Sequence, residues 1–126
     1  MINKDTTTEL PSDWAENVDY AVTIADSNCR IIYMNERSRQ SFCKNGENLI
    51  GHNLMDCHPE HARHIIRRLL KEGGSNTYSI TKNGVNKLIF QSAWKKEGKI
   101  AGLVETSMIM PHDMKHFDRD KDRNDK

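Results

Sequence analysis

Long apolar stretches and aromatic residues are scarce in this chain of 126 residues. Hydrophobic residues make up 36% of it and aromatic residues 6%. No segment approaches the roughly 20 consecutive apolar residues that a transmembrane helix needs. Residues 1–10 are polar and contain no apolar signal region. We therefore expect a protein of the cytoplasm that has no membrane partner.

An excess of charge of one sign is also missing. The chain has 19 basic and 18 acidic residues, for a net charge of +1, so no basic field favours nucleic acid. There are only three cysteines, Cys29, Cys43 and Cys57. An odd number of widely spaced cysteines predicts reduced thiols rather than a disulfide framework. The sequence contains no nucleophile elbow, phosphate loop or dinucleotide fingerprint, and we expect no enzyme activity.

The order of apolar patterns predicts an α+β fold. Two β-rich stretches flank a turn and read as a hairpin, a short polar helix follows Asn35, and a longer helix follows Pro59 and stops at Gly73. Three further strands joined by Asn-Gly and Glu-Gly turns form a meander. The predicted strands are residues 20–25, 30–34, 76–81, 87–94 and 100–108, and the longer helix is residues 60–72. We expect a five-stranded antiparallel sheet with helices packed on one face.

Composition divides the chain into three parts. Residues 1–14 are predicted to be a flexible segment or helical cap, with Ser12 capping a helix that starts near Pro11. Residues 15–110 contain all the predicted strands and form the folded domain. Residues 111–126 include ten charged residues of alternating sign, which predicts a solvated tail, either disordered or a frayed helix.

The sequence concentrates side chains that ligate metals at one point. One thiol and three imidazoles lie within eight residues, at the start of the predicted helix over residues 60–72: Cys57, His58, His61 and His64. Cysteine and histidine ligate zinc and haem iron. The spacing would allow a zinc site, but no second, distant pair of ligands accompanies it, and zinc is the less favoured prediction.

Helical geometry ranks these candidates. At about 100° per residue, the apolar face is centred on Ala62, Ile66 and Leu69. His58 lies nearest to that centre, His61 lies at its edge, and His64 lies almost opposite. A bound ligand would therefore contact Ile65, Ile66 and Leu69, with His58 or His61 as the metal ligand and Cys57 as an alternative. The competing interpretation is that His58 only caps the helix by bonding backbone groups.

Three segments resemble parts of a PAS domain. They are residues 25–35, 49–54 and 102–105, in the correct order within residues 15–110. The resemblance implies a sensor and dimerisation module that holds haem, flavin or a small metabolite. In oxygen-sensing members it implies a histidine on the central helix, where this chain has Ala62. In flavin photosensors it implies a reactive cysteine, where this chain has Leu54, so a thiol adduct to flavin is not expected here.

The resemblance leads to one favoured function and two alternatives. We expect a stand-alone sensor of a gas, small molecule or redox change. It would bind haem b between the central helix and the sheet, and signal through a homodimer or an unknown downstream protein. The alternatives are a ligand-free dimerisation module and a thiol redox sensor using Cys57, whose thiol pKa would be lowered at a helix N-terminus.

Strand 87–94 bears on the choice between a filled and an open pocket. Alternation places Phe90 and Trp94 on one face and the smaller Gln91 and Ala93 on the other. Small residues on the pocket side would leave room for a ligand, whereas the aromatic residues would fill it. The sequence leaves open which face is turned toward the helices.

Overall fold

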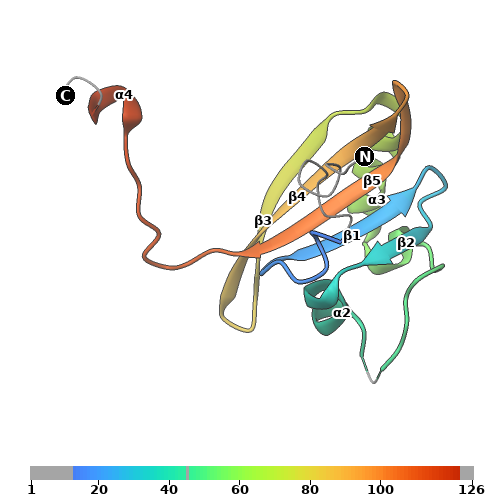
Figure 1. Ribbon diagram of the computed structural model, residues 1–126, viewed down its shortest axis with the longest axis horizontal. Coiled ribbons are helices and arrows are strands. Elements are labelled where there is room, and N and C mark those ends of the chain that lie inside the picture. Colours follow the sequence, from blue (N-terminus) through green and yellow to red (C-terminus); the bar gives the residue numbers. More distant parts are fainter. Residues whose placement is uncertain (1–12, 45, 123–126) are drawn as a thin grey trace, which may run out of the picture.

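Five strands pair into one antiparallel sheet in the computed structural model, which describes residues 13–44 and 46–122 (Figure 1). The order across the sheet is β2-β1-β5-β4-β3. The elements are β1 (Ala21–Asp26), β2 (Ile31–Met34), α2 (Glu36–Phe42), the 3-10 helix η1 (Leu54–Cys57), α3 (Glu60–Glu72), β3 (Ser75–Lys82), β4 (Val85–Lys96), β5 (Lys99–Ile109) and α4 (Arg119–Asp122). The predicted α+β fold with a five-stranded antiparallel sheet is confirmed.

Tight turns connect the three long strands as predicted. Asn83 and Gly84 have φ angles of 54° and 78°, and Glu97 and Gly98 have 53° and 80°. Two consecutive residues with positive φ give the turn whose twist matches that of the flanking strands. The strands are longer than predicted because β4 pairs with both neighbours up to these turns.

Alternation along β4 decides which side chains are turned toward the helices. Ile89 and Gln91 are buried, at 5% and 1% exposure, whereas Phe90 is 42% exposed. In the register, Gln91 is opposite Glu105 on β5, and Glu105 is opposite Thr23 on β1. The smaller residues of β4 therefore share the helix side with Glu105, and this arrangement leaves room between the layers.

Helix α2 is fixed by the fully buried side chain of Asn35. Its Oδ1 accepts from the backbone N–H groups of Ser38 and Val22, at 2.9 Å each. Its Nδ2 donates to the carbonyl oxygens of Ala15 and Tyr20, at 2.8 and 2.9 Å. One side chain thus caps α2 and ties the preceding chain to β1, as expected for an asparagine N-cap.

The helix predicted near Pro11 is replaced by turns where the structure describes the chain. Pro11 and Ser12 lie outside the described residues, and residues 13–17 form turns with one backbone bond, from Glu16 N–H to the Asp13 carbonyl. Asn35 takes the Ala15 carbonyl, which a continuing helix would need for its own i→i+4 bond. The tertiary contact therefore replaces the local helical one.

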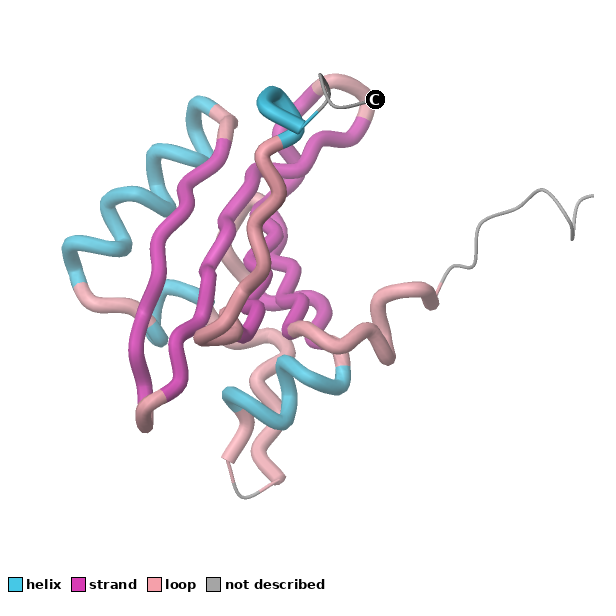
Figure 2. The backbone as a smooth tube through the Cα atoms, turned by 90° about the vertical axis from the view of Figure 1, so that its left-hand side faces the viewer, coloured by secondary structure: helices cyan, strands magenta, loops and turns pink. Residues whose placement is uncertain are grey.

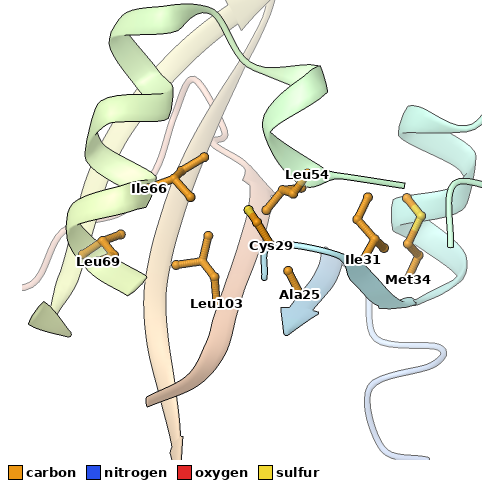
Figure 3. Packing of buried hydrophobic residues seen from close by; sticks show 8 residues of the cluster. All are labelled: Ala25, Cys29, Ile31, Met34, Leu54, Ile66, Leu69 and Leu103. Carbon is orange, nitrogen blue, oxygen red and sulfur yellow. The ribbon is translucent and has the colours of Figure 1, made fainter. Parts of the chain in front are cut away.

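Helix α3 packs across the sheet and closes the core. Figure 2 shows α3 running beside the strands, and Figure 3 shows Ile66 and Leu69 pointing toward Leu103 of β5. Ile66 and Leu69 are 0% and 1% exposed. Burying such a side chain stabilises a fold by about 2 kcal/mol. The cluster comprises Ala25, Cys29, Ile31, Met34, Leu54, Ile66, Leu69 and Leu103.

The chain after β5 leads away from the sheet (Figure 1). Residues 111–121 are exposed, and a single helical turn, α4, lies near the end of the described segment. Met114 and Phe117 are 57% and 65% exposed. No helix in the described part of the chain has both the length and the apolar character that crossing a bilayer would require.

Candidate functional site

A cavity of about 430 Å³ lies between the N-terminal half of α3 and the helix side of the sheet. This volume is within the range of roughly 300–1,000 Å³ that holds small organic ligands. The lining residues come from η1 and α3 on one side and from β3, β4 and β5 on the other. They are Cys57, His58, Pro59, His61, Ala62, Ile65, Asn76, Tyr78, Ile80, Ile89 and Glu105.

Polar side chains form a chain across the floor of this cavity. Asn76 Nδ2 on β3 donates to Gln91 Oε1 on β4 at 3.1 Å, and Gln91 Nε2 donates to Glu105 Oε1 on β5 at 2.9 Å. The three residues are neighbours in the register, so the sheet itself aligns them. Because the Gln91 amide is held at both ends, the position of the Glu105 carboxylate is fixed before any ligand enters.

His58 connects this polar chain to the helix layer. Its Nε2 lies 3.3 Å from Glu105 Oε1, and its Nδ1–H donates to the Leu54 carbonyl at 2.9 Å. The side chains of His58 and Glu105 are each 11% exposed. The backbone carbonyl of His58 in turn accepts from Arg63 Nε at 2.8 Å. The pair therefore joins the η1–α3 junction to the centre of β5.

The surroundings of His58 favour its protonated form. Both ring nitrogens face oxygen acceptors, and only the imidazolium can donate to both. The hydrogen bond with Glu105 raises the His58 pKa above 6.5, although burial acts in the opposite direction. A metal ligand must instead offer an unprotonated nitrogen with a free lone pair. The imidazolium form of His58 has none to offer, because both of its nitrogens carry protons.

The angular ranking assumed that His58 belongs to the helix, but His58 lies outside α3. The helix begins at Glu60 with Pro59 at its N-cap, and that cap makes no side-chain hydrogen bond. His58 instead closes η1 through the Leu54 carbonyl. The predicted inward direction nevertheless holds, because the extended backbone at His58 turns the ring toward β5. The competing interpretation, backbone bonding by this ring, accounts for one nitrogen and Glu105 for the other.

The other candidate ligands of the cluster lie farther out. His61 lines the cavity but is exposed, and His64 is exposed on the helix surface. Among the described residues, no group of three or more histidine, cysteine, aspartate or glutamate side chains could hold a metal ion. The geometry therefore brings His58 and His61 to one cavity without forming a ligand set.

The pKa of the Cys57 thiol is shifted in the direction opposite to the predicted one. Burial of the sulfur raises its pKa, and the carboxylates of Asp56 and Glu105 raise it further. The lowered pKa expected at a helix N-terminus is wrong, because Cys57 belongs to η1 and precedes α3 by two residues. All three cysteines are free in the structure. A protonated thiol is a poor nucleophile toward oxidants, so the site offers no activated thiol.

The apolar candidates separate into two groups. Ile65 lines the cavity, and the structure places Ile66 and Leu69 in the core beneath α3. Residues 65 and 66 are about 100° apart on the helix, so only one of them can face the cavity opening. A bound molecule would rest on Ala62 and Ile65 of α3 and on Ile80 and Ile89 of the sheet.

A much smaller cavity of about 30 Å³ lies on the core side of the His58–Glu105 pair. Its lining includes Thr23, Leu54, Cys57, His58 and Glu105, so the last three residues border both cavities. That volume is about enough for a single water molecule. The His58–Glu105 pair is therefore the partition between the larger cavity and the core.

Sequence reasoning missed Glu105, Asn76 and Tyr78 as residues of the site. Glu105 carried a usable signal, since it alternates with Leu103 and Ser107 on one face of a strand whose inward positions are otherwise uncharged. A charged residue at an inward strand position requires a partner. That partner, His58, lies 47 positions earlier in the chain.

A second depression lies on the opposite face of the sheet. It has a volume of about 510 Å³ and is lined by Trp14, Val22, Ile24, Tyr33, Val104 and neighbouring residues. Trp14 is 59% exposed although it is a large aromatic residue. Burial and a hydrogen bond to Glu16 raise the Tyr33 pKa to about 12, so its hydroxyl stays protonated. The outer face therefore presents an apolar surface at the end of the sheet where β1 and β2 lie.

Comparison with protein families gives a match over residues 15–73 to a model described as the PAS fold. A search of curated proteins finds no match. The matched segment runs from the turns before β1 to the end of α3. It therefore includes the cluster of cysteine and histidine residues but not the meander that carries Glu105.

Solved structures extend the similarity to most of the chain. The PAS domain of the histidine kinase ThkA is 19% identical, with a TM-score of 0.58, over 72% of this chain and 99% of that one. The Aer2 receptor from Vibrio cholerae, a dual PAS–haem oxygen sensor, is 19% identical, with a TM-score of 0.54, over 73% and 95%. The sensor region of a sensor histidine kinase is 16% identical, with a TM-score of 0.56, over 71% of this chain and 38% of its own length. At these identities the similarity establishes the fold.

Proposed function

This chain has the PAS fold, and we propose that its residues 15–110 form a sensory, non-catalytic module that binds a small organic molecule. The ligand would occupy the 430 Å³ cavity between α3 and the sheet. The location of such a module in the cytoplasm remains a prediction from the sequence.

The observation that supports this proposal is the His58–Glu105 contact at the cavity wall. A ligand that enters the cavity meets this pair, which joins the start of α3 to β5. Strand β5 leads directly into the chain that leaves the domain at Met110. Ligand-dependent changes in the pair would thus be passed along β5 to the segment that follows it.

The sequence predicted that haem b binds here, but the described arrangement does not fit haem b. Both nitrogens of His58 face oxygen atoms, and the Cys57 thiol pKa is raised rather than lowered. His61 lines the cavity from an exposed position. The cavity also lacks an arginine or lysine among its lining residues to pair with the propionates of haem. A smaller ligand without carboxylates is the better match.

Ligand binding is tested by titrating the purified protein with 2-phenylethanol, a neutral probe, followed by NMR of isoleucine methyl groups. We expect saturable shifts at Ile65, Ile80 and Ile89, and at the His58 ring. The Ala62→Phe variant should abolish these shifts, since the added ring occupies the cavity. Ile109→Phe, a change on an exposed strand end, is the control that should leave them intact. Shifts confined to Ile24 on the outer face would contradict the proposal.

The outer depression favours a second role, self-association. Trp14 and the neighbouring apolar side chains form the exposed apolar surface on the sheet face away from α3. We propose that a second copy of the chain covers it, giving a homodimer that transmits the signal to a downstream protein. Sedimentation velocity should show a dimer that the Trp14→Ser variant converts to monomer, while Phe117→Ser in the tail has no effect. A dimer that survives Trp14→Ser would place the interface elsewhere.

A further inference from the structure

The described residues that line the cavity between α3 and the sheet include one carboxylate, that of Glu105, and no lysine or arginine. The nearby Arg63 side chain is held outside by the His58 carbonyl, at 2.8 Å. The positive charge that faces Glu105 is that of the His58 imidazolium, which disappears when the ring loses its proton. Once His58 is neutral, the carboxylate of Glu105 is the charge that a ligand meets at this wall.

Only one of the two oxygens of the Glu105 carboxylate has a described hydrogen-bond partner. Its Oε1 takes the hydrogen bond from Gln91 and faces His58. The described residues supply no donor to Oε2, and no buried side-chain oxygen among them lacks a partner, so Oε2 reaches the accessible surface. Glu105 lines both the larger and the smaller cavity, so a molecule that enters either one can donate a hydrogen bond to this oxygen.

The pKa values of neighbouring groups are raised by the negative charge of Glu105. Burial raises the pKa of Tyr78 on β3 and that of Cys57 on η1, and the Glu105 carboxylate adds to both shifts. A site where a carboxylate makes proton loss harder for its neighbours favours positive groups and disfavours negative ones. These effects agree with the geometry of the lining residues.

Building on the proposed function, we propose that the ligand is a small apolar molecule with a protonated amine, and that the amine binds Glu105. The apolar part would rest between Ala62 and Ile65 on one side and Ile80 and Ile89 on the other. The ammonium group would donate to Oε2, an ionic hydrogen bond of the stronger kind. A carboxylate in the same position would face Glu105 without a basic side chain to pair with.

Binding of an amine is coupled to the proton on His58. The imidazolium and the ammonium share one carboxylate, so the amine binds more tightly once His58 has lost its proton. The other charged or titratable groups around the pair are Cys29 before β2, Cys57 and Asp56 on η1, His61 and Arg63 on α3, and Tyr78 on β3. A neutral ligand has no charge to compete with the imidazolium and lacks this dependence.

The test compares three probes of one size by the same isoleucine NMR titration: 2-phenylethylamine, 2-phenylethanol and phenylacetate. We expect the amine to bind roughly tenfold more tightly than the alcohol, and phenylacetate to bind most weakly. Between about pH 6 and pH 8.5 the amine should bind more tightly as pH rises, and the alcohol should not change.

Glu105→Gln is the informative variant, since it keeps the shape and removes the charge. It should bring amine and alcohol to equal affinity, whereas the matched exposed change Glu72→Gln should leave the preference intact. Equal binding of amine and alcohol in the wild type, or stronger binding of phenylacetate, would overturn the inference and leave the proposed cavity valid. Absence of shifts at Ile65 and Ile89 with all three probes would refute the proposed function as well.

Discussion

At the scale of single residues, Asn35 makes more structural contacts than any other polar side chain described above. Its four hydrogen bonds join β1, α2 and the chain before β1, and it is fully buried. A buried amide in such a place stabilises through satisfied partners, and its removal leaves several backbone groups unpaired. One side chain thus specifies how three segments meet.

Asn35→Ala is expected to lower the free energy of unfolding by about 3 kcal/mol, because it removes a helix cap and unpairs buried backbone groups. Urea denaturation measures the loss. Asn48→Ala is the matched control: Asn48 is exposed and accepts only the Ile50 N–H, at 2.9 Å. If the two variants were equally stable, the bridging role of Asn35 would be wrong.

His58 predicts a pH dependence of stability whose sign follows from its raised pKa. The imidazolium gains a partner on folding, so its contribution is fully present below the unfolded pKa near 6.5 and is lost as pH rises through the higher folded value. His58→Gln should therefore destabilise the protein more at about pH 6 than at about pH 8.5.

Urea denaturation of the wild type and the His58→Gln variant at both pH values measures this difference. His64→Gln, on the exposed side of α3, is the control and should give the same small change at each pH. A penalty for His58→Gln that grew toward alkaline pH would mean that the neutral imidazole is the form held by Glu105.

At the scale of elements, α3 has two faces with different tasks. Ile66 and Leu69 anchor it on Leu103 in the core, while Ala62 and Ile65 border the cavity. The division arises because the helix crosses the sheet, so that one stripe meets the strands and the next meets the open space. The helix can therefore be perturbed at the cavity without losing its anchor.

Truncation of Ile66, which anchors α3 in the core, should destabilise the protein. Ile66→Ala is expected to lower the free energy of unfolding by about 3 kcal/mol, since Ile66 is fully buried and its removal leaves a cavity. Ile109→Ala, at a residue that is 63% exposed, should change it by less than about 0.5 kcal/mol. Thermal and urea denaturation check both. A small loss for Ile66→Ala would show that the core can collapse around the truncated side chain.

At the scale of the whole molecule, the two faces of the sheet are used differently. The helix side holds the core and the cavity, and the outer side carries the depression beside Trp14. Strand β5 belongs to both, because Glu105 lines the cavity and Val104 lines the outer depression. A change at the cavity therefore reaches the outer face through adjacent residues of one strand.

The haem hypothesis is decided on the whole molecule by absorption spectroscopy. Adding haem to the purified protein should give a broad spectrum similar to that of free haem, because both ring nitrogens of His58 already contact oxygen atoms of the protein. The spectrum should be the same in His58→Ala, His61→Ala and His64→Ala. A sharp Soret band with near-stoichiometric uptake, lost in one variant only, would instead establish haem and identify its ligand.

Much of the fold could be predicted because its determinants are local. Asn83–Gly84 sets a tight turn, Gly73 ends α3, and Asn35 caps α2, and each acts on neighbours a few positions away. Alternation and helical periodicity then gave the order of elements. Local signals misled in the segment before β1, where Asn35 takes a carbonyl that a helix would have used.

The candidate site was only partly predictable, because its contacts join residues that are far apart in the sequence. The inward direction of His58 was predicted from helical angles, although His58 lies before the helix. Its partner Glu105 lies on the last strand, and α3 and two strands separate the two residues in sequence. Which face of β4 meets α3 was likewise open, since a shift of one residue exchanges the faces.

The sequence by itself thus determined the five strands, the helices α2 and α3, the tight turns of the meander, and the concentration of cysteine and histidine around the start of α3. Only the tertiary structure decided that His58 meets a carboxylate, that Cys57 keeps its proton, and that Ile66 and Leu69 serve the core. The physical reason is that ionisation and burial depend on which distant groups the fold brings within a few ångströms, whereas turns, caps and periodicity depend on neighbours along the chain.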